Sequence, residues 1–336
     1  MSHPIATERL VEYLRDNSTP LAGEVRVEQF SGGQSNPTYR ISAGVNQYVL
    51  RRKPPGDLLP SAHAIEREYR VIKALANTDV PVPRVFALCE DASVVGTPFF
   101  LMEHVEGRVY YDPSLPGMRP EERSALFDEL NRTFAALHAV DPAAVGLLDY
   151  GRSADYLARQ IARWTKQYRA SETERIDAME ELIGWLPSRL PDSEETSIVH
   201  GDFRIDNVIF HPTAPRILAV LDWELSTLGH PLVDFAYHCM AWRVTPDEFR
   251  GLKGHDLDTL GIPTELRYVK SYCARTGRTG IANWDYYLVF NMFRMAAILQ
   301  GVLARALAGN APSPNSLETG RRARKMAEAG WRLASQ

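Results

Sequence analysis

The chain has 336 residues, of which 45% are hydrophobic, and this is enough to build a substantial core in one large domain or two ordinary ones. Its formal net charge of −4 argues against a nucleic-acid-binding surface. The longest apolar stretch, residues 286–308, is interrupted by polar and charged side chains, so it indicates a packed helix and no membrane association. Three widely spaced cysteines and an N-terminus without a signal-peptide core favour a reducing, cytoplasmic location, and the oligomeric state stays open.

The first 105 residues alternate short apolar runs with turns, which predicts a lobe built around a β-sheet. Apolar residues at helical spacing indicate an opening helix over residues 5–14. A second helix is predicted from about Ser61 to about Asn77. Strands are predicted at residues 25–30, from 38 onward, and at 48–51, 85–88 and 98–103.

A glycine-containing loop, residues 31–36, separates the first two predicted strands. Glycines at such a place let backbone amides approach a phosphate closely, and serine hydroxyls can add contacts. The candidate phosphate-binding residues are Ser31, Gly32, Gly33 and Ser35. A plain hairpin turn would explain the same glycines, so both interpretations stay open.

Glu68 lies inside the apolar stripe of the second predicted helix. A carboxylate on a packing face is costly unless it is paired. Strand alternation places Arg51 on the same face as Val49. Arg51 is the natural partner for Glu68. Two alternatives remain: the head of Glu68 could reach water, and Arg51 could be the solvated end of a strand.

Beyond residue 105 the pattern becomes helical. Helices are predicted at residues 121–139, 155–169, 179–190, 264–275 and 283–308, with one that opens at 229–231 and one after about 316. Between them lie two apolar runs around a proline-rich turn, residues 208–221, which predict a β-hairpin.

The most distinctive stretch, His-Gly-Asp-Phe-Arg-Ile-Asp-Asn at residues 200–207, leads into this hairpin, and Asp222 follows it. Folding of the hairpin would bring Asn207 beside Asp222. Their amide and carboxylate oxygens are the hard ligands that Mg²⁺ takes alongside nucleotide phosphates. Asp202 is then left to orient a hydroxyl and to accept its proton.

His-Gly-Asp-x-x-x-x-Asn, followed by Leu-Asp-Trp-Glu at residues 221–224, resembles the aminoglycoside phosphotransferase and choline kinase family, the small-molecule relatives of protein kinases. The residues around both motifs are similar to a subgroup that includes kinase-like modules fused to acyl-CoA dehydrogenases in animals, and stand-alone bacterial relatives. The resemblance implies an α+β, bilobal protein-kinase-like fold. Its N-terminal nucleotide-binding lobe, residues 1–105, would hold an antiparallel sheet with one main helix. The larger, mostly helical lobe, residues 106–336, would hold the catalytic and substrate-binding residues.

The resemblance also implies roles for individual residues. Arg51 would contact the nucleotide phosphates, and backbone groups near Glu103 and Val105 would pair with adenine. Arg204 would steady the γ-phosphate, although a surface charge explains it as well. Asp234 resembles the family's buried aspartate that braces the catalytic loop.

The chain is therefore predicted to be an ATP- and Mg²⁺-dependent phosphotransferase that moves the γ-phosphate to a hydroxyl of a small molecule. A hydroxyacyl or hydroxyacyl-CoA acceptor is favoured, and aminoglycoside-type and choline-type acceptors stay open. A non-catalytic nucleotide-binding regulatory module is a second possibility, although it would have no need of a base. A third is a metal-dependent hydrolase using His200, Asp202, His211, Asp222 and His230.

Overall fold

The structure is a computed structural model that describes residues 5, 7–17, 19–30, 36–56, 64–310 and 313–336. The chain divides into two compact units. The N-terminal unit comprises Met1–Arg108, Val145–Leu147 and Val208–Ser226. The C-terminal unit comprises Val109–Ala144, Leu148–Asn207 and Thr227–Gln336.

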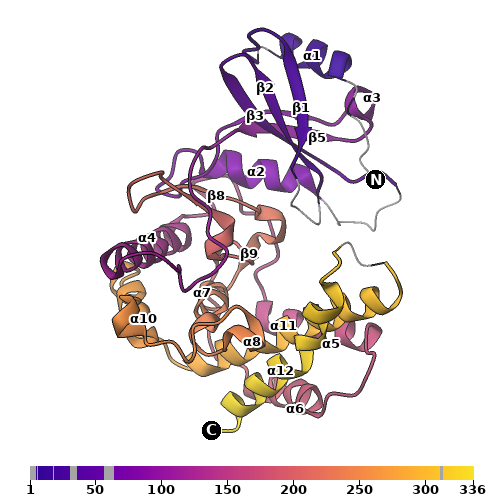
Figure 1. Ribbon diagram of the computed structural model, residues 1–336. Helices are drawn as coiled ribbons and strands as arrows, with labels where there is room; N and C mark the ends of the chain where they lie inside the picture. Colours follow the sequence, from indigo (N-terminus) through magenta and orange to yellow (C-terminus); the bar gives the residue numbers. More distant parts are fainter. Residues whose placement is uncertain (1–4, 6, 18, 31–35, 57–63, 311–312) are drawn as a thin grey trace. The chain divides into compact units, whose positions relative to one another are not determined.

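The N-terminal unit is built on a five-stranded antiparallel sheet of strand order β1-β2-β3-β5-β4 (Figure 1). Its strands are β1 (Val25–Gln29), β2 (Thr38–Ala43), β3 (Asn46–Arg52), β4 (Val85–Cys89) and β5 (Phe99–Glu103). Along β2, buried Tyr39 and Ile41 alternate with half-buried residues, because side chains of a strand point to opposite faces. Leu10 and Leu14 of helix α1 (Thr7–Asp16) join the same core.

Two further helices and a separate hairpin also belong to this unit. They are α2 (Ile65–Leu75), which contacts β4 and β5, α3 (Ala92–Val95), and the pair β7 (Val208–Phe210) and β8 (Ile217–Val220). The hairpin is fixed by backbone hydrogen bonds, since Arg108 and Phe210 exchange two of 2.8 and 2.9 Å. The amide of Val220 donates to the carbonyl of Pro81 at 2.8 Å. The predicted hairpin is thus confirmed, with Val208 opposite Val220.

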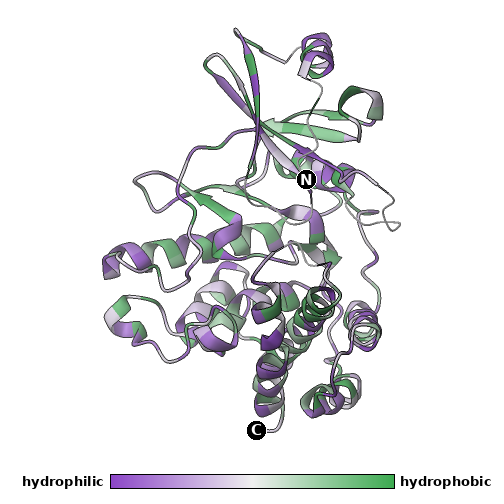
Figure 2. Ribbon diagram, turned by 45° about the vertical axis from the view of Figure 1, so that its right-hand side comes forward, coloured by the Kyte–Doolittle hydropathy of each residue, from purple (hydrophilic) through white to green (hydrophobic). Residues whose placement is uncertain are grey.

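The C-terminal unit is mostly helical. Its helices are α4 (Pro120–Ala139), α5 (Tyr156–Ala170), α6 (Asp177–Trp185), α7 (Pro231–Cys239), α8 (Pro246–Phe249), α9 (Leu257–Leu260), α10 (Glu265–Arg275), α11 (Trp284–Leu307) and α12 (Ser316–Ala334). A two-stranded antiparallel pair, β6 (Ser197–Val199) and β9 (Thr227–Gly229), lies among them. The helices carry both hydrophobic and hydrophilic residues, as amphipathic helices do (Figure 2).

Helix α11 contacts α12, α7 and α5 and forms the centre of this unit. Within the described part of the chain it is the one helix long and apolar enough to cross a membrane, and 83% of its most apolar window is buried. Burial against other helices accounts for that apolar surface, as the sequence predicted.

The α+β architecture predicted from the sequence, an antiparallel sheet with one main helix and a mostly helical remainder, is confirmed. Helix α2 begins at Ile65 with Ala64 in the N-cap position, later than predicted, and Ser61 lies outside the described residues. The helix predicted over residues 179–190 is divided, because α6 ends at Trp185 and a separate 3-10 turn covers Pro187–Arg189. A proline inside a helix lacks the amide that would continue its hydrogen bonds, which explains the interruption at Pro187.

Candidate active site

The loop that follows β6 is held by a buried carboxylate. Asp234 of α7 is 3% exposed and accepts hydrogen bonds from the backbone amides of His200 at 2.7 Å and Gly201 at 2.8 Å. Gly201 has φ +82°, a left-handed conformation that favours glycine. The role of Asp234 as a brace, which the family resemblance implied, is confirmed by these contacts.

The environment of Asp234 keeps it charged. Burial alone would raise the pKa of this carboxyl, but the hydrogen bond from His138 and the amide of Gly201 outweigh it, so the pKa lies below its usual value. The Nε2 atom of His138 lies 3.3 Å from Asp234 Oδ2, and its Nδ1 atom lies 2.7 Å from the hydroxyl of Tyr272. A charged, fully bonded brace holds the loop in one conformation.

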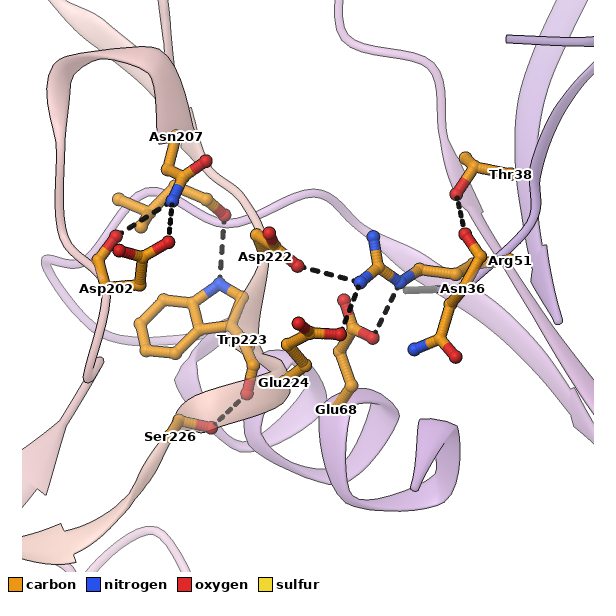
Figure 3. Close-up of polar contacts among 11 residues, drawn as sticks. Asn36, Thr38, Arg51, Glu68, Asp202, Asn207, Asp222, Trp223, Glu224 and Ser226 are labelled. Carbon is orange, nitrogen blue, oxygen red and sulfur yellow. Dashed lines mark hydrogen bonds and ion pairs between the residues drawn. The ribbon is translucent and has the colours of Figure 1, made fainter. Parts of the chain in front are cut away.

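Asp202 presents a carboxylate with both oxygens hydrogen-bonded or ion-paired. The amide nitrogen of Asn207 donates to Asp202 Oδ2 at 3.0 Å and to the Asp202 carbonyl at 2.8 Å (Figure 3). The hydroxyl of Tyr237 donates to Oδ1, and Arg204 Nε lies 3.2 Å from the same atom. The Asp202 side chain remains 21% exposed, so this oriented carboxylate can still meet a substrate hydroxyl.

Tyr237 and Arg294 support this carboxylate, and the sequence did not reveal either of them. Burial, and then the charge of Asp202, raises the pKa of Tyr237 well above its usual value, so the hydroxyl stays a donor. Arg294 donates to the carbonyl of Gly201 at 2.7 Å, and its guanidinium lies 5.2 Å from the ring centre of Tyr237. A signal for Tyr237 was present, because it follows Asp234 by three residues and therefore lies on the same face of α7.

In the N-terminal unit, Arg51 lies among three carboxylates. Its Nε atom is 2.8 Å from Glu68, and its Nη2 atom is 2.7 Å from Asp222 and 3.4 Å from Glu224 (Figure 3). The ion pair between Arg51 and Glu68 that the sequence predicted is confirmed. Asp222 follows β8 by two residues, with φ +63°, at the N-cap of the 3-10 turn Trp223–Leu225.

The electrostatics of this cluster depend on burial. Glu68 is 2% exposed, and burial raises its pKa to about 7 against the opposing effect of Arg51, with Asp222 and Glu224 raising it further. Burial likewise disfavours the charge on Arg51, but the three carboxylates outweigh it and raise the pKa of the guanidinium. The cluster thus holds a permanent cation close to Asp222, one of the predicted metal ligands.

The predicted ligands of Mg²⁺ are distributed over both units. Asn207, in the C-terminal unit, uses its amide nitrogen on Asp202, which leaves its amide oxygen as the atom for a metal. Asp222, in the N-terminal unit, has a side chain 35% exposed. Each of them offers an oxygen atom of the kind that Mg²⁺ takes, since this ion keeps several waters and shares substrate phosphates.

The histidines are used in the structure of the loops and helices. His200 is 0% exposed, with Nδ1 accepting from the amide of Asp202 at 3.2 Å. His211 accepts from the amides of Thr213 and Ala214, and His230 caps α7. The described ranges contain no group of three or more His, Cys, Asp or Glu side chains that could hold a metal. These placements disfavour the metal-dependent hydrolase.

The remaining predicted site residues are placed only in part. Glu103 ends β5 opposite Tyr48, and its carboxylate accepts from the amide of Arg84 at 3.3 Å. Val105 lies half-buried just after that strand. Their contact with adenine stays a prediction. The candidate phosphate loop, with Ser31, Gly32, Gly33 and Ser35, lies outside the described residues.

Known proteins resemble this chain over most of its length. The model of the phosphotransferase enzyme family matches residues 26–267. Acyl-CoA dehydrogenase family member 10 of Mus musculus is 50% identical over 336 residues, covering 99% of this chain and 31% of that protein. Family member 11 of Rattus norvegicus is 45% identical over 313 residues, covering 92% of this chain and 40% of that protein. The chain thus spans less than half the length of these curated relatives.

Solved structures of phosphotransferases and kinases are also similar to this chain. A crystal structure from Ralstonia eutropha, described as that of a candidate aminoglycoside phosphotransferase, is 54% identical with a TM-score of 0.91, covering 99% of both chains. The aminoglycoside phosphotransferase APH(4)-Ia, solved with AMP-PNP and hygromycin B, is 18% identical with a TM-score of 0.63, covering 97% of both chains. Choline kinase from Cryptosporidium parvum is 13% identical with a TM-score of 0.63, covering 98% of this chain and 97% of that one.

The last two similarities establish the fold, which is the protein-kinase-like fold predicted from the sequence. The family match covers well over half of the chain, and its limits enclose the loop at residues 200–207 and the acidic motif at residues 221–224. This chain belongs to the phosphotransferase enzyme family.

Proposed function

We propose that the chain is an ATP- and Mg²⁺-dependent kinase that phosphorylates a hydroxyl of a small molecule. The observation that carries the proposal is the Asp202 carboxylate, held by Asn207, Tyr237 and Arg204 on a loop that Asp234 braces. A fixed and partly exposed carboxylate can orient an acceptor hydroxyl and take its proton as the hydroxyl oxygen bonds to the γ-phosphorus of ATP. The bond from that phosphorus to the bridging oxygen breaks, and ADP leaves.

The charges of the N-terminal unit suit the phosphate donor. Arg51 would bind phosphate oxygens of ATP, since a guanidinium keeps its charge and offers several donors. Asn207 and Asp222 would hold Mg²⁺, which neutralises charge on the phosphates when it is bound. Glu68 keeps Arg51 in place at 2.8 Å. Arg204, whose Nε atom lies 3.2 Å from Asp202, is proposed to steady the transferred phosphoryl group.

The acceptor that we propose is a hydroxyacyl compound, free or as a CoA thioester. Curated relatives that contain a matching segment are named acyl-CoA dehydrogenase family members. A kinase module that shares a polypeptide with such a protein would act on a related acyl compound. Aminoglycoside-type and choline-type acceptors are the alternatives, because solved structures of similar fold carry those names.

The proposal is tested with the Asp202→Asn variant in an ATP-consumption assay over a panel of hydroxyl compounds. We expect the variant to bind Mg²⁺–ATP as the wild-type protein does and to lose at least a hundredfold in turnover, the scale of one positioned base. Full turnover in Asp202→Asn would remove this carboxylate from the mechanism.

A second variant, Asp222→Asn, separates catalysis from nucleotide binding. We expect the Mg²⁺-dependent part of its ATP affinity to disappear, which titration calorimetry with and without Mg²⁺ measures. A wild-type protein that binds Mg²⁺–ATP but consumes none with any compound of the panel would instead support a regulatory nucleotide-binding module.

A further inference from the structure

We infer that an apolar pocket in the C-terminal unit receives the hydrocarbon chain of the acceptor and that positive charge in its lining turns cationic acceptors away. This inference rests on the proposed kinase function and specifies the substrate class of the same site. All residues that line the pocket belong to the C-terminal unit, so binding to it can be measured without nucleotide.

The wall of the pocket is apolar, aromatic and rigid. Phe127 and Trp242 contact each other edge to face with ring centres 5.5 Å apart. The indole nitrogen of Trp242 donates to the carbonyl of Pro263 at 2.8 Å, which fixes the ring. The buried apolar side chains that line the pocket include Phe127, Leu130, Ile205, Met240, Trp242 and Leu252. A preformed apolar wall binds hydrocarbon without reorganising.

Two residues connect this pocket to the proposed base. Tyr237 lines the pocket, and its hydroxyl donates to Asp202. Arg204 also lines the pocket, with its Nε atom 3.2 Å from Asp202. An acceptor whose chain lies against Phe127 and Trp242 can therefore present a hydroxyl near Asp202. Such a chain must carry its hydroxyl at a carbon outside the apolar segment.

The charges at the pocket favour a neutral or anionic acceptor. Three charged side chains line it: Arg204, Asp206 and Arg250. Asp206 is shared by both arginines, at 3.3 Å from Arg204 and 2.6 Å from Arg250. The sum of these three charges is +1, and the carboxylate of Asp206 is already paired. The nearby carboxylate of Asp202 is itself ion-paired with Arg204, so a polycationic aminoglycoside would have to compete with arginine for every counter-charge. The aromatic wall alone could attract a quaternary ammonium group, but the adjacent arginines oppose it.

The size of the pocket limits the chain that it can hold. Its cavity volume is about 60 Å³. A water-sized group requires on the order of 10–15 Å³ of such volume, so the cavity holds roughly four to six groups of this size. The inferred acceptor is therefore a hydroxyacyl compound with a short hydrocarbon segment inside the pocket.

Binding without nucleotide tests the pocket apart from phosphate transfer. The probes are a series of straight-chain 3-hydroxyacyl N-acetylcysteamine thioesters of rising chain length, with choline and kanamycin as cationic comparators, titrated calorimetrically into the wild-type protein. We expect affinity to rise about fourfold per methylene, the factor that corresponds to burial of one methylene, until the pocket is filled. Choline and kanamycin should bind more weakly than the best thioester.

A matched pair of variants locates the effect. Ala241 lines the pocket, and Ala304 is an equally half-buried alanine of α11 outside it. In Ala241→Leu, affinity for the thioesters should stop rising at a chain length about three carbon atoms shorter than in the wild-type protein. In Ala304→Leu, the affinities for all thioesters should be unchanged. Arg250→Gln, which removes one positive charge, should strengthen binding of choline about threefold.

The outcomes separate this inference from the kinase proposal. No dependence on chain length in the wild-type protein, an unchanged series in Ala241→Leu, or tighter binding of kanamycin than of any thioester would each overturn the pocket assignment. A protein that binds the thioester series as expected but phosphorylates none of its members would support the pocket and overturn the proposed function. Phosphorylation of small alcohols without any chain-length preference would support the proposed kinase function and overturn the pocket assignment.

Discussion

Replacement of Asp234 by asparagine tests the brace on which the catalytic loop depends. In the wild-type protein its two carboxylate oxygens accept the amides of His200 and Gly201 at 2.7 and 2.8 Å. An asparagine has one acceptor oxygen, so one amide would lose its partner and face the asparagine NH₂ group. The change removes one charge-assisted hydrogen bond, worth about 1.5–3 kcal/mol, and leaves one buried donor unsatisfied, which costs about 1–3 kcal/mol.

We therefore expect Asp234→Asn to lower the free energy of unfolding by about 4 kcal/mol, a large part of the roughly 5–15 kcal/mol of a typical protein. Urea denaturation followed by circular dichroism measures this difference. Turnover should fall as well, because the loop would no longer hold Asp202 in place. The control is Asp128→Asn, whose side chain is 64% exposed beside Arg275 and which should change stability by less than about 0.5 kcal/mol. Equal stability of the two variants would refute the brace.

Three further predictions follow from contacts in the two units. Arg51→Met should lower the free energy of unfolding by about 3–5 kcal/mol, because it leaves Glu68 buried without its partner. The double variant Arg51→Met with Glu68→Leu should recover most of that stability in urea denaturation. Additive losses of stability would contradict a coupled pair. Burial lowers the pKa of His238 to about 4, against about 6.5 in the unfolded chain. Below about pH 6.5 the unfolded chain takes up a proton that the folded protein does not, so the free energy of unfolding falls by on the order of 3 kcal/mol as the pH drops towards 4. His238→Gln should flatten the pH dependence of unfolding over that window, and an unaltered slope would count against it. Tyr237→Phe should lower kcat about tenfold and leave the KM for ATP unchanged, because it removes one donor from Asp202; steady-state kinetics at saturating acceptor decide this.

Local patterns in the sequence predicted the elements near the site well. The alternation along residues 38–51 and the proline-rich turn between β7 and β8 are properties of neighbouring residues, so they could be read without the fold. The pairing of Glu68 with Arg51 was predictable for a different reason, since a charge on a packing face requires a partner.

Other features depend on contacts between residues far apart in the chain. Tyr237 reaches Asp202 across 35 positions, and Arg294 reaches Gly201 across 93. The pairing of β6 with β9 joins two segments of only three residues each, which are too short to show a period. The apolar pocket is likewise lined by residues of α4 and of the segment after α7, and no local sequence pattern predicts a surface formed by such distant segments.

The two units are not continuous in sequence, and this limits how the protein can be cut into fragments. Residues 208–226, with the hairpin and Asp222, belong to the N-terminal unit although the C-terminal unit supplies the sequence on both sides of them. A truncation after Arg108 would therefore separate Arg51 from Asp222. A fragment that starts at Val109 would carry a hairpin without its backbone hydrogen-bond partners, the carbonyl of Pro81 and the amide and carbonyl of Arg108. Genetic dissection of this protein thus calls for excision and relinking of internal segments, since no single cut yields either half intact.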